Sequence, residues 1–227
     1  VGHLWFVYML MAIYLIAPVL SPWIVSASRK SMELFLALWG VTLTLPFIHL
    51  FFSAVWGECY WNATPTLYYF SGFIGYAVLA AYIRRFWMAP SLRIDWFAIG
   101  MVVVGYAATA GGFLYRLRYE HSVQSLELTW NFTILNVAVM TAGLFLLFRN
   151  IHGSDSRVWR WIDDLSRLSY GMYLAHIIVL NAVHSHLAPL LGNAYLRIPT
   201  IAITTFVITY LAVKLISLLP GSKYIVG

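Results

Sequence analysis

The sequence predicts an all-α integral membrane protein, a polytopic bundle of about seven transmembrane helices. Of its 227 residues, 62% are hydrophobic and 10% are charged, whereas about 25% of the residues of a soluble domain are charged. The apolar stretches are long continuous runs rather than ten-residue alternations, which excludes an outer-membrane β-barrel. We therefore expect residues 1–227 to form a single transmembrane domain whose main partner is the lipid bilayer.

Seven apolar runs are each long enough to cross a hydrocarbon core of about 30 Å. Pro18 and Pro22 are expected to break the first run near its end. Gly72 and Gly75 give the third run a small-residue face for close helix contact. The predicted spans are Leu4–Val25, Met32–Val55, Leu67–Ile83, Trp96–Tyr115, Trp130–Phe148, Leu168–His184 and Leu196–Leu219.

Basic residues gather in alternate connections between these spans, which fixes the expected orientation. The cation-rich connections carry Arg29, Lys30, Arg84, Arg85, Arg93, Arg149, Arg157, Arg160, Arg167 and Lys223. The positive-inside rule then places the N-terminus of the chain outside and its C-terminus in the cytoplasm. Arg116 and Arg118, after the fourth span, run against this pattern. Topology accounts for the net charge of +6, so no nucleic-acid partner is predicted.

The connections themselves show few further signals. Arg157–Leu165 places its apolar residues on one helical face and is expected to be a short helix on the inner membrane surface. His184 and His186 are assigned to an outer loop; residues two apart point away from each other on a helix, and no metal site is predicted. The single cysteine, Cys59, excludes an internal disulfide.

The stretch with the most functional information is Asp164–Leu180. Ser169, Tyr173 and His176 stand at i, i+4 and i+7, so they share one helix face. His176 lies roughly 12 Å along the helix from the start of the span, close to mid-membrane. An ionisable group at that depth is costly and marks a functional site by default. The alternative is a buried histidine that hydrogen-bonds a carbonyl of a neighbouring helix.

Other polar residues lie at comparable positions in the spans. His3 opens the first span on the outer side, His49 lies near the outer end of the second, and Asn181 lies further out than His176 on the sixth. If these spans pack together, the four side chains form a ladder from the membrane centre to its outer face. Each of them is also explained by a packing hydrogen bond.

Four markers in order along the chain resemble the membrane acyltransferase-3 family. The late helix carries a pattern similar to the family's S-x-G-I-Y-x-x-H. The corresponding segments here are HLWFVYML at His3–Leu10 followed by YLIAP at Tyr14–Pro18, YFSGFIG at Tyr69–Gly75, LSYGMYLAH at Leu168–His176, and the ending Pro220–Gly227. Together they span essentially the whole chain.

The resemblance implies an enzyme of the bacterial inner membrane. Such enzymes transfer an acyl group, usually acetyl, from cytoplasmic acyl-coenzyme A to a hydroxyl of an extracytoplasmic glycan or glycolipid. Acetyl-CoA would be the co-substrate, without a metal. Family members have about ten helices, and the first span here resembles their fourth. The chain starts at Val1 without a methionine, so we expect three further helices upstream, including the first helix with the family's catalytic arginine and histidine.

The resemblance also suggests roles for individual residues. His176, Tyr173 and Ser169 would line the passage where acyl thioester and hydroxyl meet. Acceptor binding would fall to residues toward the outer side: His3, Trp5, Tyr8, His49 and Asn181. Arg84 and Arg85 would attract the phosphates of coenzyme A, although topology signalling alone also explains them.

Two other classes of function compete with acyl transfer. A membrane transporter or proton-coupled carrier would also place a histidine and an asparagine inside its spans. Transporters commonly show matching halves with broken helices, and this sequence has no internal symmetry. The second alternative is a non-catalytic membrane fragment that is stable but inactive.

Overall fold

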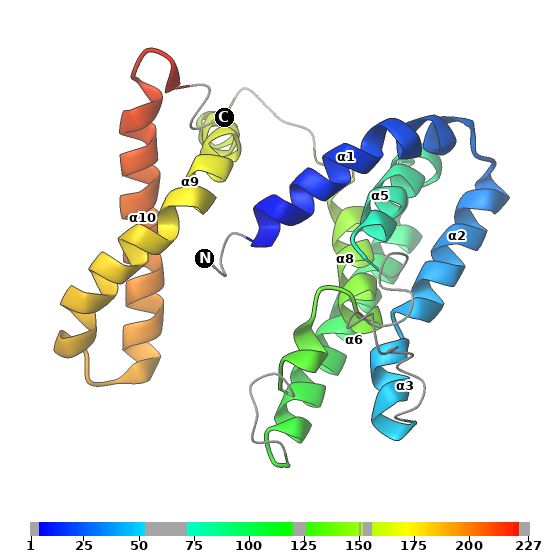
Figure 1. The fold of residues 1–227 in the computed structure, drawn as a ribbon, viewed down its shortest axis with the longest axis horizontal. Coiled ribbons are helices and arrows are strands. Elements are labelled where there is room, and N and C mark those ends of the chain that lie inside the picture. Colours follow the sequence, from blue (N-terminus) through cyan, green and yellow to red (C-terminus); the bar gives the residue numbers. More distant parts are fainter. Residues whose placement is uncertain (1–4, 53–71, 120–125, 150, 152–155, 223–227) are drawn as a thin grey trace, which may run out of the picture. The chain divides into compact units, whose positions relative to one another are not determined.

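The computed structural model of the chain describes residues 5–52, 72–119, 126–149, 151 and 156–222. Within these ranges the regular structure is entirely helical, which confirms the predicted all-α class. Contacts divide the chain into two compact units, Val7–Ile151 and His152–Gly227 with Val1–Phe6. Each unit is described by itself below, with the helices labelled as in Figure 1.

The unit of residues 7–151 contains most of the helices. Pro18 and Pro22 lie inside the first helix, which continues through both, so the predicted break is wrong; membrane helices tolerate internal proline. The predicted second span is instead divided just before Pro46, in the first turn of its second half. The elements are α1 (Trp5–Ser26), α2 (Arg29–Thr42), α3 (Leu45–Phe51), α5 (Ile74–Phe86), α6 (Leu92–Arg116), η3 (Leu128–Trp130) and α8 (Leu135–Phe148).

Helices α2 and α5 meet at a tryptophan that fits against glycine. Trp39 is 4% exposed, and its Nε1 donates to the carbonyl oxygen of Gly72 at 3.2 Å. A Cβ added at Gly75 would lie 2.0 Å from the Trp39 ring. Only glycine leaves room for the indole there, which confirms the predicted close contact at Gly75.

Helices α6 and α8 also pack closely, with a glycine of each helix against the backbone of the other. A Cβ at Gly105 of α6 would lie 2.7 Å from the carbonyl oxygen of Asn136, and one at Gly143 of α8 would lie 2.7 Å from that of Ala98. Small residues at both crossing points allow the van der Waals contact that holds helices together where the surroundings are apolar.

A buried ion pair joins the end of α8 to the start of α6. Arg149 Nη1 lies 2.8 Å from Asp95 Oδ1, and the arginine side chain is 1% exposed. The same nitrogen donates to the carbonyl oxygen of Leu146. Arg149 therefore has a structural role besides its predicted one as a topology signal, because a charge buried this deeply is stable only when it is paired.

The unit of residues 152–227 is a pair of long helices, α9 (Arg157–Leu187) and α10 (Ala194–Ser217), joined through η4 (Ala188–Leu190) and antiparallel in Figure 1. Helix α9 begins at Arg157, so the predicted short helix Arg157–Leu165 forms its first turns and is not a separate element; its position on the inner membrane surface stays a prediction. His184 and His186 lie in the last turn of α9, so their assignment to a loop is also wrong. Residues 157–165 and the two histidines are therefore parts of one uninterrupted helix.

A carboxylate holds the start of α9 to the end of α10. Asp164 accepts hydrogen bonds from Lys214, from the Tyr210 hydroxyl at 2.8 Å and from Arg167 at 2.8 Å. The hydrogen bond from Lys214 is the main cause that lowers the pKa of Asp164 to about 2. Below this cluster Leu168 packs with its apolar neighbours on α10.

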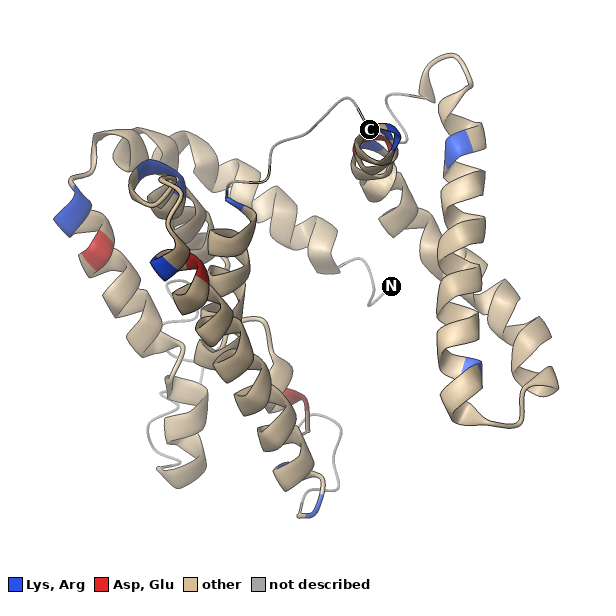
Figure 2. Cartoon of the chain, turned by 180° about the vertical axis from the view of Figure 1, so that it is seen from behind, with Lys and Arg blue, Asp and Glu red and all other residues tan. Residues whose placement is uncertain are grey.

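Five stretches of the described chain are long and apolar enough to cross a membrane: Trp5–Ser26, Arg29–Phe51, Leu92–Arg116, Leu128–Phe148 and Ala194–Ser217. Helix α9 is longer than any of them, but His176, Asn181 and His184 lower the hydropathy of its apolar half. Charged residues lie toward the helix ends in Figure 2. The chain is a multi-pass membrane protein.

The glycine contact predicts opposite effects of one substitution at two positions of α6. Gly105→Ala should lower the stability in detergent by about 1–3 kcal/mol, the cost of overpacking, because the new methyl meets the backbone of α8. Gly100 has nothing within 4 Å of an added Cβ, so Gly100→Ala should raise stability by roughly 0.5–1 kcal/mol through helix propensity. Thermal unfolding of both variants compares them. Equal effects at the two positions would contradict the close crossing.

The carboxylate cluster predicts a pH dependence. Because the folded-state pKa of Asp164 is depressed, its stabilisation is present above its unfolded-state value near 4 and is lost as the pH falls toward 2. Asp164→Asn should lower stability at pH 7 and flatten its change between pH 5 and pH 2. Asp163→Asn, which removes the same charge one residue away, is the control. A pH profile altered equally by both variants would contradict the assignment.

Candidate functional site

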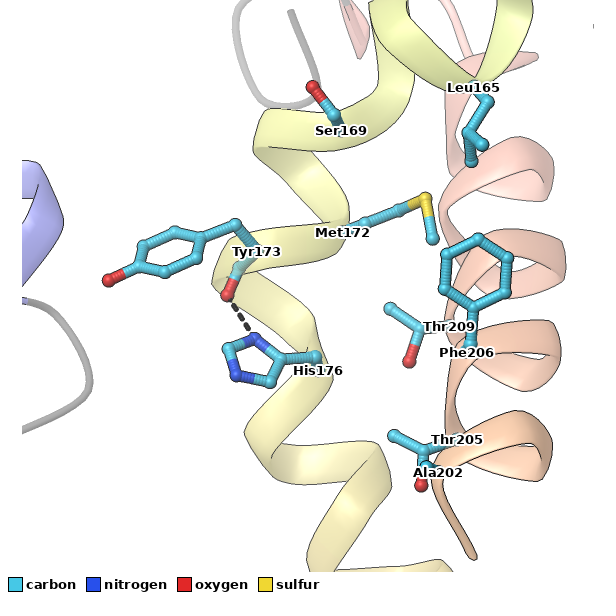
Figure 3. A pocket seen from close by; sticks show the side chains of 9 residues that line it. All are labelled: Leu165, Ser169, Met172, Tyr173, His176, Ala202, Thr205, Phe206 and Thr209. Carbon is cyan, nitrogen blue, oxygen red and sulfur yellow. Dashed lines mark hydrogen bonds between the residues drawn. The ribbon is translucent and has the colours of Figure 1, made fainter. Parts of the chain in front are cut away.

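A groove of about 530 Å³ runs between α9 and α10. Its walls are mostly carbon, with a few polar groups on both helices (Figure 3). Cavities of this kind, apolar with a small number of placed polar groups, are the usual form of ligand sites. The lining residues are Leu165, Ser169, Met172, Tyr173, His176, Ala202, Thr205, Phe206 and Thr209. The three residues predicted to share one face of the sixth span all line it.

The hydrogen bonding of His176 defines its tautomer. Its Nδ1 lies 2.5 Å from the backbone carbonyl oxygen of Tyr173, one turn earlier on α9 (Figure 3). A carbonyl oxygen only accepts, so Nδ1 carries the proton in the neutral ring and Nε2 carries the lone pair. This contact is made within α9, and the alternative of a packing hydrogen bond to a neighbouring helix stays open. This arrangement is the one that orients a histidine for use as a base.

Tyr173 and Ser169 flank the histidine differently. The Tyr173 ring packs beside the imidazole at 5.6 Å between centroids and extends away from α10 in Figure 3. The Ser169 hydroxyl donates to the carbonyl oxygen of Ser166 at 2.7 Å. Tyr173 thus positions His176 with both its carbonyl and its ring, while the hydroxyl of Ser169 is bonded to its own helix.

The opposite wall contains two residues that the sequence analysis did not single out. Thr205 and Thr209 are 7% and 1% exposed, and neither hydroxyl has a hydrogen-bond partner within the described ranges. A buried hydroxyl without a partner costs free energy, so each is a candidate donor to a bound group. Their i, i+4 spacing was available in the sequence, but Thr200 and Thr204 in the same span have the same spacing.

The remaining predicted acceptor-binding residues are distributed over the chain. His3 lies outside the described residues. Trp5 and Tyr8 are exposed on α1, 41% and 63% respectively, and His49 is half-buried on α3. Asn181 lies on α9 five residues beyond the histidine, on another face, and does not line the groove. The predicted polar ladder involves both units, and it stays a prediction.

The two arginines predicted to bind phosphate differ in their surroundings. Arg85 Nη1 donates to the carbonyl oxygens of Ile24, Val25 and Ala27 at 3.0–3.3 Å, so it caps the C-terminal end of α1. Arg84 is exposed and lines a separate cavity of about 270 Å³ at the same end of the unit. A capping role is established by these contacts for Arg85; phosphate binding stays a prediction for both.

Comparison with known proteins gives one match. The family of acyltransferase domains matches residues 1–218, nearly the whole chain. No curated protein and no solved structure matches it. The family match covers three of the four markers found in the sequence, and their described residues lie in α1, at the start of α5 and in the groove-lining part of α9; the ending Pro220–Gly227 lies beyond the matched residues. On this match, the chain belongs to the acyltransferase-3 family of membrane acyltransferases.

Proposed function

We propose that the protein transfers an acetyl or other acyl group from cytoplasmic acyl-CoA to a hydroxyl of an extracytoplasmic glycan or glycolipid, and that the α9–α10 groove forms part of the passage where transfer occurs. Membership of the acyltransferase family supports the reaction class. The observation that carries the site is the His176–Tyr173 hydrogen bond at the groove wall.

The reaction needs a base for the acceptor hydroxyl. The resemblance places the family's catalytic histidine on an upstream helix, and within this chain we assign the base to His176: its Nε2 takes the hydroxyl proton while the oxygen attacks the thioester carbonyl carbon. The tetrahedral intermediate then collapses, the carbon–sulfur bond breaks, and the proton passes from Nε2 to the leaving thiolate. Positive charge on the imidazole is stabilised by the Nδ1–H donating to the Tyr173 carbonyl, as the third group of a triad does.

The reaction also needs donors for the oxyanion. Hydroxyls aimed at developing negative charge are worth more in a water-excluded site than in water. Thr205 and Thr209 supply two buried hydroxyls on the wall opposite His176. We assign them to this role, because an oxyanion would satisfy groups that otherwise remain without a partner.

Membrane orientation follows from the same proposal. The charged start of α9, with Arg157, Arg160 and Arg167, is placed on the cytoplasmic side of the inner membrane, where acyl-CoA is found. The N-terminus of the chain is then outside, and the acceptor enters the groove from the His184 end. Arg84 and Arg85, both exposed, are proposed to attract the phosphates of coenzyme A.

His176→Ala is the direct test of the site. In membranes that carry the protein expressed from its natural gene, transfer of label from acetyl-CoA to the surface glycan should fall about 100-fold or more, the usual contribution of a general base. His176→Asn and His176→Gln keep hydrogen bonding but cannot titrate, and they should be equally inactive. Protein abundance is measured in parallel by immunoblot.

A matched control is His184→Ala, which removes an exposed histidine from the last turn of the same helix. It should leave the activity unchanged. If His176 only packs, His176→Ala would lower stability by roughly 0.6–1.7 kcal/mol, as interhelical hydrogen bonds in membranes do. Unchanged activity per folded molecule would then refute the site assignment.

The orientation is tested with cysteines at two described loops. In a Cys59→Ser background, Ala89→Cys between α5 and α6 should be protected from a membrane-impermeant maleimide in intact cells. Gly192→Cys, between α9 and α10, should react. Both positions are exposed. The reverse labelling pattern would overturn the proposed topology.

A further inference from the structure

A cluster of charged side chains lies where the start of α2 meets the end of α5. The Tyr82 hydroxyl of α5 donates to Glu33 Oε1 of α2 at 2.6 Å, so the two helix ends are in direct contact. Glu33 is the only acidic residue of either helix, whereas their cations are Arg29, Lys30, Arg84 and Arg85. The cluster therefore has an excess of positive charge.

Two of these arginines come from different helices and pack on one aromatic ring. The guanidinium carbon of Arg29 lies 5.6 Å from the centre of the Phe86 ring, and that of Arg85 lies 5.3 Å from it. Distances within about 6 Å are those of cation–π contacts, which attract a guanidinium to an aromatic face. The positive-inside rule accounts for cations at this end of the helices, but it does not require two of them to share one ring.

Both guanidiniums keep donors for a further group. Each guanidinium has five N–H donors. Arg29 uses Nε in its ion pair with Glu33 at 2.8 Å, and Arg85 uses Nη1 for the carbonyl oxygens at the end of α1. Both residues are exposed, so a ligand in solution or at the membrane surface can approach them.

We propose that Arg29 and Arg85 bind a phosphate-bearing ligand, with Lys30 as a third positive charge. Phosphate oxygens accept hydrogen bonds from a guanidinium in a planar, two-point geometry that a lysine does not supply. The contacts with Phe86 restrict both arginines before a ligand arrives, so less conformational entropy is lost on binding. The excess of cations over Glu33 favours a ligand that carries negative charge.

Two kinds of phosphate compound meet this end of the helices in the orientation proposed above. One is coenzyme A in the cytoplasm, and the other is an anionic phospholipid, which basic clusters beside membrane helices also bind. Use of the site for coenzyme A rests on the function proposed above, and it adds Arg29, from a second helix, to Arg85. Binding of phosphate itself does not rest on that function.

Two binding measurements on the protein, expressed from its natural gene and purified in a neutral detergent, distinguish these sources. Titration calorimetry gives the dissociation constant of free coenzyme A, and native mass spectrometry gives the retention of phosphatidylglycerol relative to phosphatidylcholine. Each is measured for the wild type, Arg29→Gln, Glu33→Gln and Arg93→Gln. Arg93 is the matched control, because it is an exposed arginine in the first turn of another helix, α6.

Arg29→Gln should weaken the binding of coenzyme A, of phosphatidylglycerol or of both about fivefold, the effect of one cation near an anionic surface. The ligand whose affinity falls identifies the source of the phosphate. Glu33→Gln breaks the same ion pair but keeps Arg29 and removes a repelling charge, so it should bind at least as tightly as the wild type. Arg93→Gln should bind as the wild type does.

Unchanged affinity of Arg29→Gln for both ligands would overturn the proposal. Equal weakening by Glu33→Gln would also overturn it, because the ion pair and not the guanidinium would then matter, and equal weakening by Arg93→Gln would reveal only a general effect of charge. If the phosphate site fails these tests while His176→Ala abolishes transfer, the proposed function stands. If the phosphate binds as expected while His176→Ala retains full activity, only the proposed function fails.

Discussion

The absence of hydrogen-bonding solvent in the bilayer core is the constraint on which this structure depends. A polar group in hydrocarbon must find its partner within the protein. The Asn136 amide nitrogen does so with Thr109 and the backbone of η3. At the helix ends, the guanidinium of Arg149 pairs with Asp95 and with a carbonyl of its own helix. These contacts join α8 to α6 and to η3.

Close approach of the helices makes such contacts possible. Gly105 and Gly143 bring α6 and α8 within touching distance of each other's backbone, and the amide of Asn136 then spans the short remaining gap. The groups that stay unsatisfied within the described ranges stand out against this background. Thr205 and Thr209 beside the α9–α10 groove are hydroxyls whose burial is costly unless a partner completes them.

Much of the fold could be predicted from the sequence because hydropathy and helix periodicity are local properties. Five of the seven predicted spans, the shared face of Ser169, Tyr173 and His176, and the contact at Gly75 all follow from them. Interruptions were harder to place: Pro18 and Pro22 read as a break, yet a membrane helix continues through them. The merging of Arg157–Leu165 into α9 was missed because an amphipathic start and an apolar continuation also fit two separate helices.

Only one wall of the candidate groove, the one formed by α9, could be predicted from the sequence. One wall could be found because a histidine in an apolar span is conspicuous, whereas the threonines of α10 resemble ordinary membrane-helix residues until their burial is known. Contacts between residues distant in sequence could not be predicted either. The sequence indicates Arg85 only as a topology signal, whereas its capping of α1 depends on the packing of α5 beside the end of that helix. Such pairings depend on tertiary contacts that no local pattern contains.

The tautomer of His176 tests the central claim most directly, since a base at Nε2 requires the proton on Nδ1. Nitrogen NMR of protein with labelled histidine, assigned by comparison with His176→Gln, reads the two ring nitrogens separately. At a pH where the ring is neutral, Nδ1 should give a protonated, pyrrole-type signal and Nε2 an unprotonated, pyridine-type signal. A protonated Nε2 with an unprotonated Nδ1 would contradict the account.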